Sequence, residues 1–217
     1  MKPAVALRGC CRSVQKADQG QQESGEMKKA TILSLLACIC LASVSANTWA
    51  AEPFKKALDL QGFSFFVEAT NEGSINQLKI TPSGLTKDNT PAASEIEGTV
   101  SGAEIGDLDA NGFPEVYVFV TSAGSGSYGS LVAYAVNNGK SMTPIYLPPI
   151  TDDAKASKGY MGHDEFAVLE NVLGRRFPIY KEGDTNSDPS GKTRQLQYKL
   201  VPGEAGWVLQ LKDITEF

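Results

Sequence analysis

Apolar and polar residues alternate along several short segments of this chain, and a period of two is what a half-buried β-strand requires. The alternation is clearest in residues 63–68 and 195–200. Further strand candidates are residues 78–80, 96–105, 140–147, 165–171, 175–181 and 206–212. Turn-forming residues separate these segments, at 81–84, 148–149, 182–191 and 202–203. Apart from one helical turn expected at residues 54–60, the pattern predicts an all-β fold, an antiparallel β-sandwich or barrel of roughly eight to ten strands.

The first fifty residues have the features of an export segment. Residues 27–29 (Met-Lys-Lys) are basic, the apolar run 32–42 is too short to span a membrane, and small residues follow it. We expect a signal peptide at residues 27–50, cleaved after Ala50 or, as the second choice, after Ala46, and an exported protein. A lipoprotein would use Cys38, which leaves a very short apolar core. Residues 1–26 are expected to be an upstream start-site extension, and residues 51–217 a single domain.

Cysteine content and charge limit the chemistry of that domain. The four cysteines all precede residue 51, so residues 51–217 have neither a disulfide nor a thiol nucleophile: Cys10, Cys11, Cys38 and Cys40. Six of the 20 basic and three of the 25 acidic residues also lie there, which leaves 14 basic against 22 acidic residues and a formal net charge of −8. An acidic domain argues against nucleic acid and anionic membranes as partners, and favours cationic partners.

A glycine- and serine-rich stretch, residues 121–130, lies between two expected strands. Residues 113–120 before it are apolar, β-branched and aromatic, residues 131–136 after it are similar, and the hairpin signal Asn138-Gly139 follows. Its single large side chain is Tyr128, which would offer contact area at low entropic cost, as binding loops do. The glycines also match a dinucleotide fingerprint, but a strand rather than a helix follows them, so we expect no nicotinamide site and no other cofactor.

The histidine content argues against an enzyme. Residues 51–217 contain one histidine, His163, without a Gly-x-Ser-x-Gly elbow that would mark a serine nucleophile. A zinc site would need more histidine or cysteine ligands than remain. We therefore expect His163 to be a structural or surface residue.

Oxygen-bearing residues at alternate positions run from Asp107 to Glu115. Asp107, Asp109, Asn111 and Glu115, with Gly112 for a sharp turn, are typical of a calcium loop. An EF-hand would need its bidentate glutamate where the chain has Val118, together with flanking helices. An Asx-rich turn before a strand explains the same residues without a metal, and that is the interpretation we favour.

Three segments together resemble the periplasmic inhibitors of invertebrate-type (i-type) lysozyme found in Gram-negative bacteria. They are Gly-Asp-Leu-Asp-Ala-Asn-Gly-Phe-Pro-Glu at residues 106–115, Ser-Gly-Ser-Tyr at 125–128, and residues 164–172 with Arg-Arg-Phe-Pro-Ile-Tyr at 175–180. The resemblance covers the chain from about Phe54 to its end. It implies a β-sandwich that inhibits i-type lysozyme by protein–protein contact, without catalysis. The family's inhibitory serine and tyrosine correspond to Ser125 and Tyr128, and Gly126 and Ser127 supply the turn between them.

Three questions stay open at the level of sequence. An exported calcium-binding β-domain with an adhesion or surface role is the alternative function, with Asp107, Asp109, Asn111 and Glu115 as its working residues. Within the inhibitor interpretation, the target among lysozyme classes rests on the resemblance. A homodimer is possible, because a sandwich edge can pair across a two-fold axis.

Overall fold

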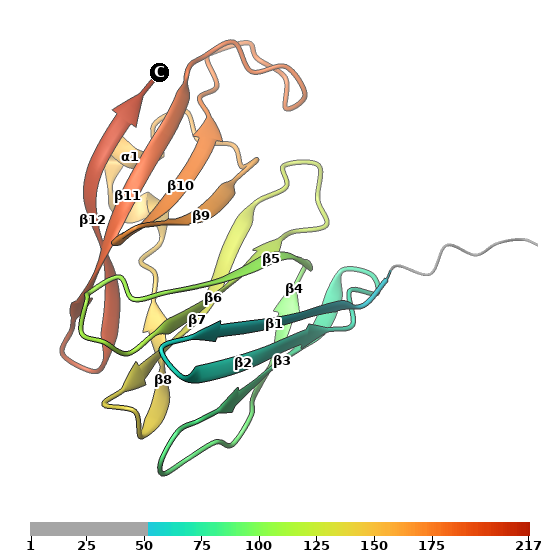
Figure 1. Ribbon diagram of the computed structural model, residues 1–217. Helices are drawn as coiled ribbons and strands as arrows, with labels where there is room; N and C mark the ends of the chain where they lie inside the picture. Colours follow the sequence, from blue (N-terminus) through green and yellow to red (C-terminus); the bar gives the residue numbers. More distant parts are fainter. Residues whose placement is uncertain (1–51) are drawn as a thin grey trace, which may run out of the picture. The chain divides into compact units, whose positions relative to one another are not determined.

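Twelve β-strands account for most of residues 52–217, the part of the chain that the computed structural model describes (Figure 1). They form two sheets, so the all-β sandwich expected from the sequence is confirmed. The expected upstream extension (1–26) and signal peptide (27–50) lie outside the described residues.

The smaller sheet has four antiparallel strands in the order β1-β2-β3-β4. Its strands are β1 (Phe54–Leu60), β2 (Phe63–Ala69), β3 (Ile75–Ser83) and β4 (Ala92–Glu97). The helical turn expected at residues 54–60 is wrong, because this segment is β1 and pairs along its whole length with β2. Gln61 and Gly62 join the two strands with φ values of 53° and 85°, the left-handed backbone that a tight hairpin needs.

The larger sheet has eight strands in the order β5-β6-β7-β8-β12-β11-β10-β9. Its strands are β5 (Thr99–Gly106), β6 (Glu115–Thr121), β7 (Gly129–Asn137), β8 (Ser141–Tyr146), β9 (Glu165–Leu169), β10 (Val172–Pro178), β11 (Thr193–Pro202) and β12 (Trp207–Glu216). Only β8 and β12 pair in parallel, over two residue pairs. A 3₁₀ turn (η1, Ile150–Asp152) and a short helix (α1, Ala154–Ser157) connect β8 to the segment before β9.

Asn138-Gly139 forms the hairpin turn that the sequence predicts between β7 and β8. The strand expected at residues 96–105 is divided between β4 and β5. This division is one reason why the number of strands, twelve, exceeds the expected eight to ten. Gly98 separates β4 from β5 with a φ of 119°, and a Cβ at this position would collide with the Thr121 carbonyl oxygen. The chain passes from one sheet to the other at this glycine.

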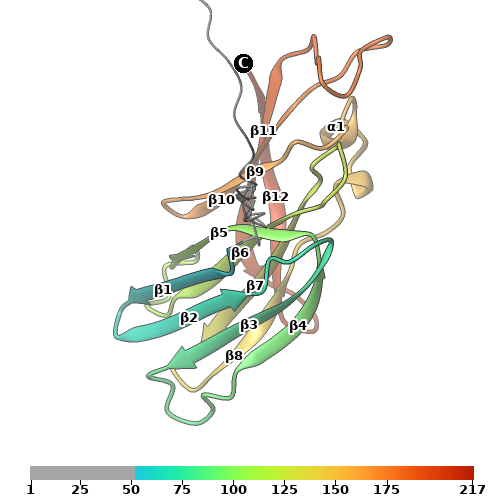
Figure 2. The same ribbon diagram turned by 90° about the vertical axis from the view of Figure 1, so that its right-hand side faces the viewer.

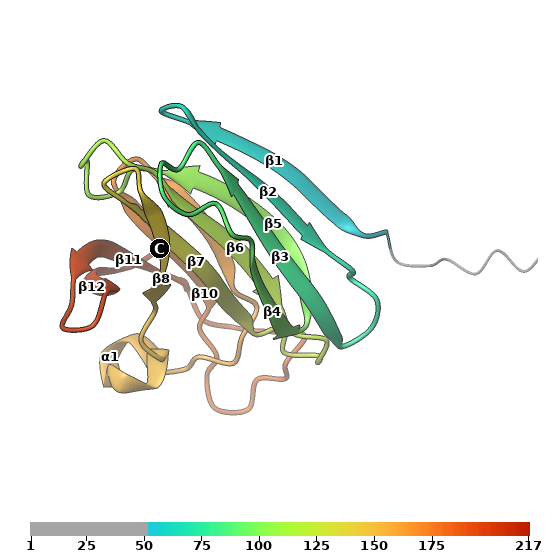
Figure 3. The ribbon, with the colours of Figure 1, turned by 90° about the horizontal axis from the view of Figure 1, so that it is seen from below.

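Strand β6 is buried on both faces and lies between two hydrophobic clusters. Val116, Val118 and Val120 face the cluster shared with the four-stranded sheet. Tyr117 and Phe119 face a second cluster, formed with strands β10 to β12. Figures 1 and 3 show β5–β8 lying between the four-stranded sheet and β9–β12.

The larger sheet curls so that its two end strands meet. The Val168 amide of β9 donates to the Glu104 carboxylate of β5 at 2.6 Å. This curl brings the loop that follows β6 close to the loops that flank β9 and β10, as Figure 2 shows for the yellow-green and orange segments.

Candidate loop site after strand β6

The expected binding residues lie in the connection Ser122–Tyr128 between β6 and β7, here called the β6–β7 loop. Its two ends are closed by reciprocal bonds. The Ser122 amide donates to the Tyr128 carbonyl oxygen, and the Tyr128 amide donates to Ser122 Oγ, both at 2.9 Å. Inside the loop, the Ser127 amide donates to the Gly124 carbonyl oxygen at 2.9 Å. These bonds stabilise the loop from within the chain itself.

The two residues that carry the expected contacts are both exposed to solvent, Tyr128 on one side of its ring. Ser125 is exposed and Tyr128 is 48% exposed. Neither hydroxyl has a hydrogen-bond partner within residues 52–217. Gly126 is buried, and Ser127 is half-buried with a φ of 44° in the turn between them. The loop therefore offers two free hydroxyl groups of the kind that both donate and accept hydrogen bonds.

Gly126 lets the tyrosine ring lie back over the loop. A Cβ at this position would collide with the Tyr128 ring. The Gly126 carbonyl oxygen accepts a hydrogen bond from the His163 amide at 2.7 Å. Gly162, with a φ of 94°, packs so closely on that carbonyl that it too has no room for a Cβ.

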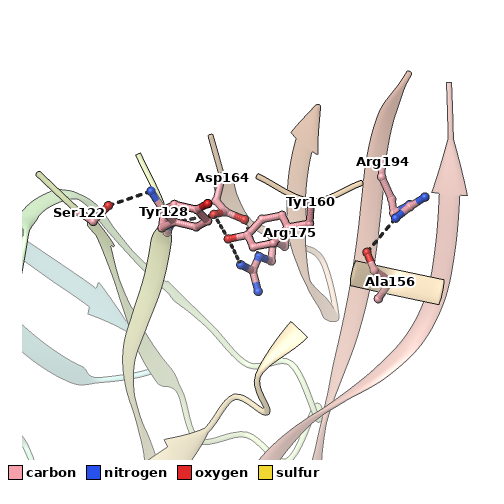
Figure 4. Close-up of polar contacts among 8 residues, drawn as sticks. Ser122, Tyr128, Ala156, Tyr160, Asp164, Arg175 and Arg194 are labelled. Atoms are coloured by element: carbon pink, nitrogen blue, oxygen red, sulfur yellow. Dashed lines mark hydrogen bonds and ion pairs between the residues drawn. The ribbon is translucent and has the colours of Figure 1, made fainter. Parts of the chain in front are cut away.

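A buried ionic network supports the loop at its β7 end (Figure 4). The Asp164 carboxylate accepts from Arg175 Nε at 2.7 Å, from the Tyr160 hydroxyl at 2.6 Å and from the Gly129 amide at 2.7 Å. The Arg175 Nη2 group also donates to the Tyr160 hydroxyl, at 2.8 Å. The Tyr160 ring contacts the Tyr128 ring edge-on, with 5.6 Å between centroids. The network thus holds both the backbone at the loop's end and the side chain that the loop presents.

Burial of this network governs its protonation. Burial raises the pKa of Tyr160, and the adjacent Asp164 carboxylate raises it too, so the phenol keeps its proton and donates it to Asp164. Burial alone would lower the pKa of Arg175, but the charge and the hydrogen bond of Asp164, together with Tyr160 and Tyr198, outweigh it and the net shift is upward. The side chains of Arg175 and Asp164 are 6% and 0% exposed, so their ion pair is fully shielded from solvent.

The connection between β10 and β11 contacts the β6–β7 loop as well. Asn186, in the connection between β10 and β11, donates from Nδ2 to the Ser125 carbonyl oxygen at 2.5 Å. The Asn186 carbonyl oxygen lies 3.1 Å from His163 Nε2 and accepts from the Tyr180 hydroxyl at 2.9 Å. Through these contacts His163 links the segment before β9 to the connection between β10 and β11.

Arg194 ties the segment before β9 to the sheet. It is 4% exposed and donates from Nη1 to the Ala156 carbonyl oxygen at 2.8 Å (Figure 4). The same Nη1 group donates to the Lys158 carbonyl oxygen at 2.6 Å. From the same guanidinium, Nη2 donates to the Glu216 carboxylate of β12 at 2.7 Å. The residues that follow Lys158, including Tyr160 and Asp164, are thereby anchored at their start.

The acidic residues at 107–115 form a separate cluster, at the other end of β6. Amides of Asn111 and Gly112 donate to Asp107, each at 2.9 Å, which is the Asx-rich turn expected from the sequence. One carboxylate oxygen each of Asp107, Asp109 and Glu115 lies within 4.8 Å of the others. Burial of Glu115 raises its pKa to about 8, and the neighbouring aspartates add to the rise, whereas the bond from the Leu108 amide opposes it.

No protein-family model matches the chain, and none of the curated proteins matches its sequence. Within residues 52–217, no helix has the length and apolar character that spanning a membrane requires.

Proposed function

We propose that this protein is a periplasmic inhibitor of i-type lysozyme, which inserts residues 125–128 into the enzyme's active-site groove. The observation that carries the proposal is the β6–β7 loop: it is braced on three sides, and it presents the hydroxyl groups of Ser125 and Tyr128 without internal partners. The resemblance of the chain to such inhibitors names the same two residues.

The chemistry of the target suits this loop. A muramidase groove holds two catalytic carboxyl groups, one of which is protonated. A hydroxyl group can accept from the protonated carboxyl group and donate to the ionised one. Bonds to a charged carboxylate are the stronger kind, and a tyrosine that becomes buried at an interface is a common hot spot. Occupation of the groove would exclude the substrate without any chemical step in the inhibitor.

The rigidity of the loop supports an inhibitory role. Ordering a flexible loop on binding reduces affinity, whereas a loop that is already ordered avoids this cost. The closing bonds at Ser122, the Asp164 network and the Asn186 contact provide that order in the free protein. The formal charge of −8 on residues 51–217 would in addition speed the encounter with a cationic enzyme.

The test is a bacterial lysis assay with the purified protein against invertebrate-, chicken- and goose-type lysozymes. Inhibition of the invertebrate type alone is expected. Equal inhibition of all three types would overturn the assignment of the target class, and no inhibition of any type would overturn the function. A periplasmic location, the lack of nucleic-acid and membrane partners, and a homodimer stay predictions.

A further inference from the structure

The turn between β5 and β6 holds a group of acidic residues that the β6–β7 loop does not use. It brings Asp107, Asp109 and Glu115 together at the start of β6. Within residues 52–217, no lysine, arginine or histidine forms an ion pair with any of the three. Three carboxyl groups at this spacing repel one another unless a proton or a cation compensates them.

Glu115 provides the observation that points to a ligand. It is 0% exposed, and its Oε2 atom accepts from the Leu108 amide at 2.8 Å and from the Tyr117 hydroxyl at 3.3 Å. Its Oε1 atom is buried and has no hydrogen-bond partner within the described part of the chain. A buried carboxylate oxygen without a partner is costly, and native proteins satisfy nearly all such atoms.

We propose that Asp107, Asp109 and Glu115 bind a divalent cation, and that this cation is Ca²⁺. Calcium binds oxygen ligands at 2.3–2.6 Å, so the ligand atoms around one ion lie up to about 5 Å apart. The limit of 4.8 Å between the three carboxylate oxygens fits that geometry. Magnesium needs shorter bonds, at 2.0–2.1 Å, and usually keeps several water molecules, so a site that offers three protein carboxylates suits calcium better.

Asn111 lies beside the carboxylates and could supply a neutral oxygen ligand if its amide group turned over. Its Nδ2 group donates to Asp109 Oδ2 at 2.8 Å, and its Oδ1 atom accepts from the Phe113 amide at 2.7 Å. Calcium sites combine carboxylates with amide and backbone carbonyl oxygens and with water, and reach six to eight ligands in this way.

The ion would stabilise the junction of the two sheets. Gln61, in the β1–β2 turn of the smaller sheet, donates to Asp107 Oδ2 at 2.8 Å. The cluster lies at the start of β6 and the β6–β7 loop at its end, so seven strand residues, roughly 20 Å, separate them. Calcium is therefore a structural ligand here, and lysozyme inhibition does not depend on it directly.

The experiment is a calorimetric titration of the chelator-treated protein with CaCl₂, repeated with MgCl₂, together with thermal unfolding. The wild-type protein is expected to bind one Ca²⁺ more tightly than Mg²⁺. Its melting temperature should rise by about 5–10 °C when free calcium exceeds the dissociation constant 100-fold. Terbium should bind in place of calcium and show luminescence sensitised by Tyr117, which contacts Glu115.

Two variants locate the site. Asp109→Asn keeps the size of the side chain and is expected to weaken calcium binding at least tenfold. Asp152→Asn removes one exposed charge elsewhere and should bind calcium as the wild type does. The proposal is overturned if the wild-type protein neither binds calcium nor gains thermal stability from it, or if Asp109→Asn binds as tightly as the wild type. Lysozyme inhibition measured with chelator present is expected to persist, which separates this proposal from the inhibitory function.

Discussion

Replacement of Arg175 by methionine tests how the β6–β7 loop is supported. Methionine keeps an unbranched apolar side chain but removes the guanidinium group, so Asp164 loses its ion pair and its 2.7 Å bond from Nε. The Asp164 side chain stays shielded from solvent with its charge uncompensated. Removing one partner of a buried ion pair costs about 3–5 kcal/mol. We expect that loss in the free energy of unfolding and, at about 2–4 °C per kcal/mol for a chain of this size, a melting temperature lower by roughly 6–20 °C.

The contacts of Arg175 with aromatic rings contribute a smaller part of the expected loss of unfolding free energy. Its Cζ atom lies 5.1 Å from the centroid of the Tyr160 ring and 5.3 Å from that of Phe166. A cation over an aromatic ring contributes about 0.5–2 kcal/mol, and methionine retains some of the packing. The uncompensated Asp164 charge therefore dominates the expected cost.

The assay is urea unfolding followed by fluorescence, with the midpoint and the slope fitted for each protein. Arg176→Met is the matched control, because Arg176 is the next residue and is exposed, and its guanidinium contacts Gln195 and the Phe217 ring at the surface. This control should lose less than about 1 kcal/mol. If Arg175→Met loses as little as the control, Asp164 is not held by a buried ion pair and the account of the loop support is wrong.

Three predictions concern the loop itself. Tyr128→Ala should cost about 2–4 kcal/mol of binding free energy to i-type lysozyme, measured as a change in the inhibition constant. Tyr146→Ala, which removes a comparably exposed tyrosine from β8, should leave that constant unchanged. Ser125→Ala should cost about 1–2 kcal/mol, the contribution of one hydrogen bond to a charged group, with an unchanged melting temperature. Gly126→Ala should weaken inhibition at least tenfold, because the added methyl group displaces the Tyr128 ring, and normal inhibition by this variant would mean that the ring position is unimportant.

Much of the sheet structure could be predicted from local patterns. The apolar run before residue 121 predicted a buried strand, and β6 is that strand, because it lies between two clusters and every residue but its last is buried. Asn138-Gly139 predicted a hairpin because these two residues readily adopt positive φ, and both have positive φ in the structure. The sequence did not predict strand β1. Gln61-Gly62 forms a hairpin turn with positive φ at both residues, as Asn138-Gly139 does, but glutamine is a weaker signal for such a turn than asparagine.

The spacing of residues in the sequence could not predict which residues support the β6–β7 loop. Tyr160 and Asp164 lie in the connection before β9, whereas Arg175 lies in β10, and their contact with the β6–β7 loop depends on the curl that brings β9 and β10 beside that loop. The burial of Glu115 was equally hidden, because a glutamate at the start of a strand is normally exposed. In contrast, the exposure of Ser125 and Tyr128 follows from their place in a small-residue loop between two buried strands.

The most direct measurement is an inhibition titration of i-type lysozyme with the wild-type protein and with the Ser125→Ala/Tyr128→Ala double variant. We expect strong inhibition by the wild type and at least a hundredfold weaker inhibition by the double variant, with both proteins folded and similarly stable. Equal inhibition by the two proteins would contradict the claim that the β6–β7 loop blocks the lysozyme groove.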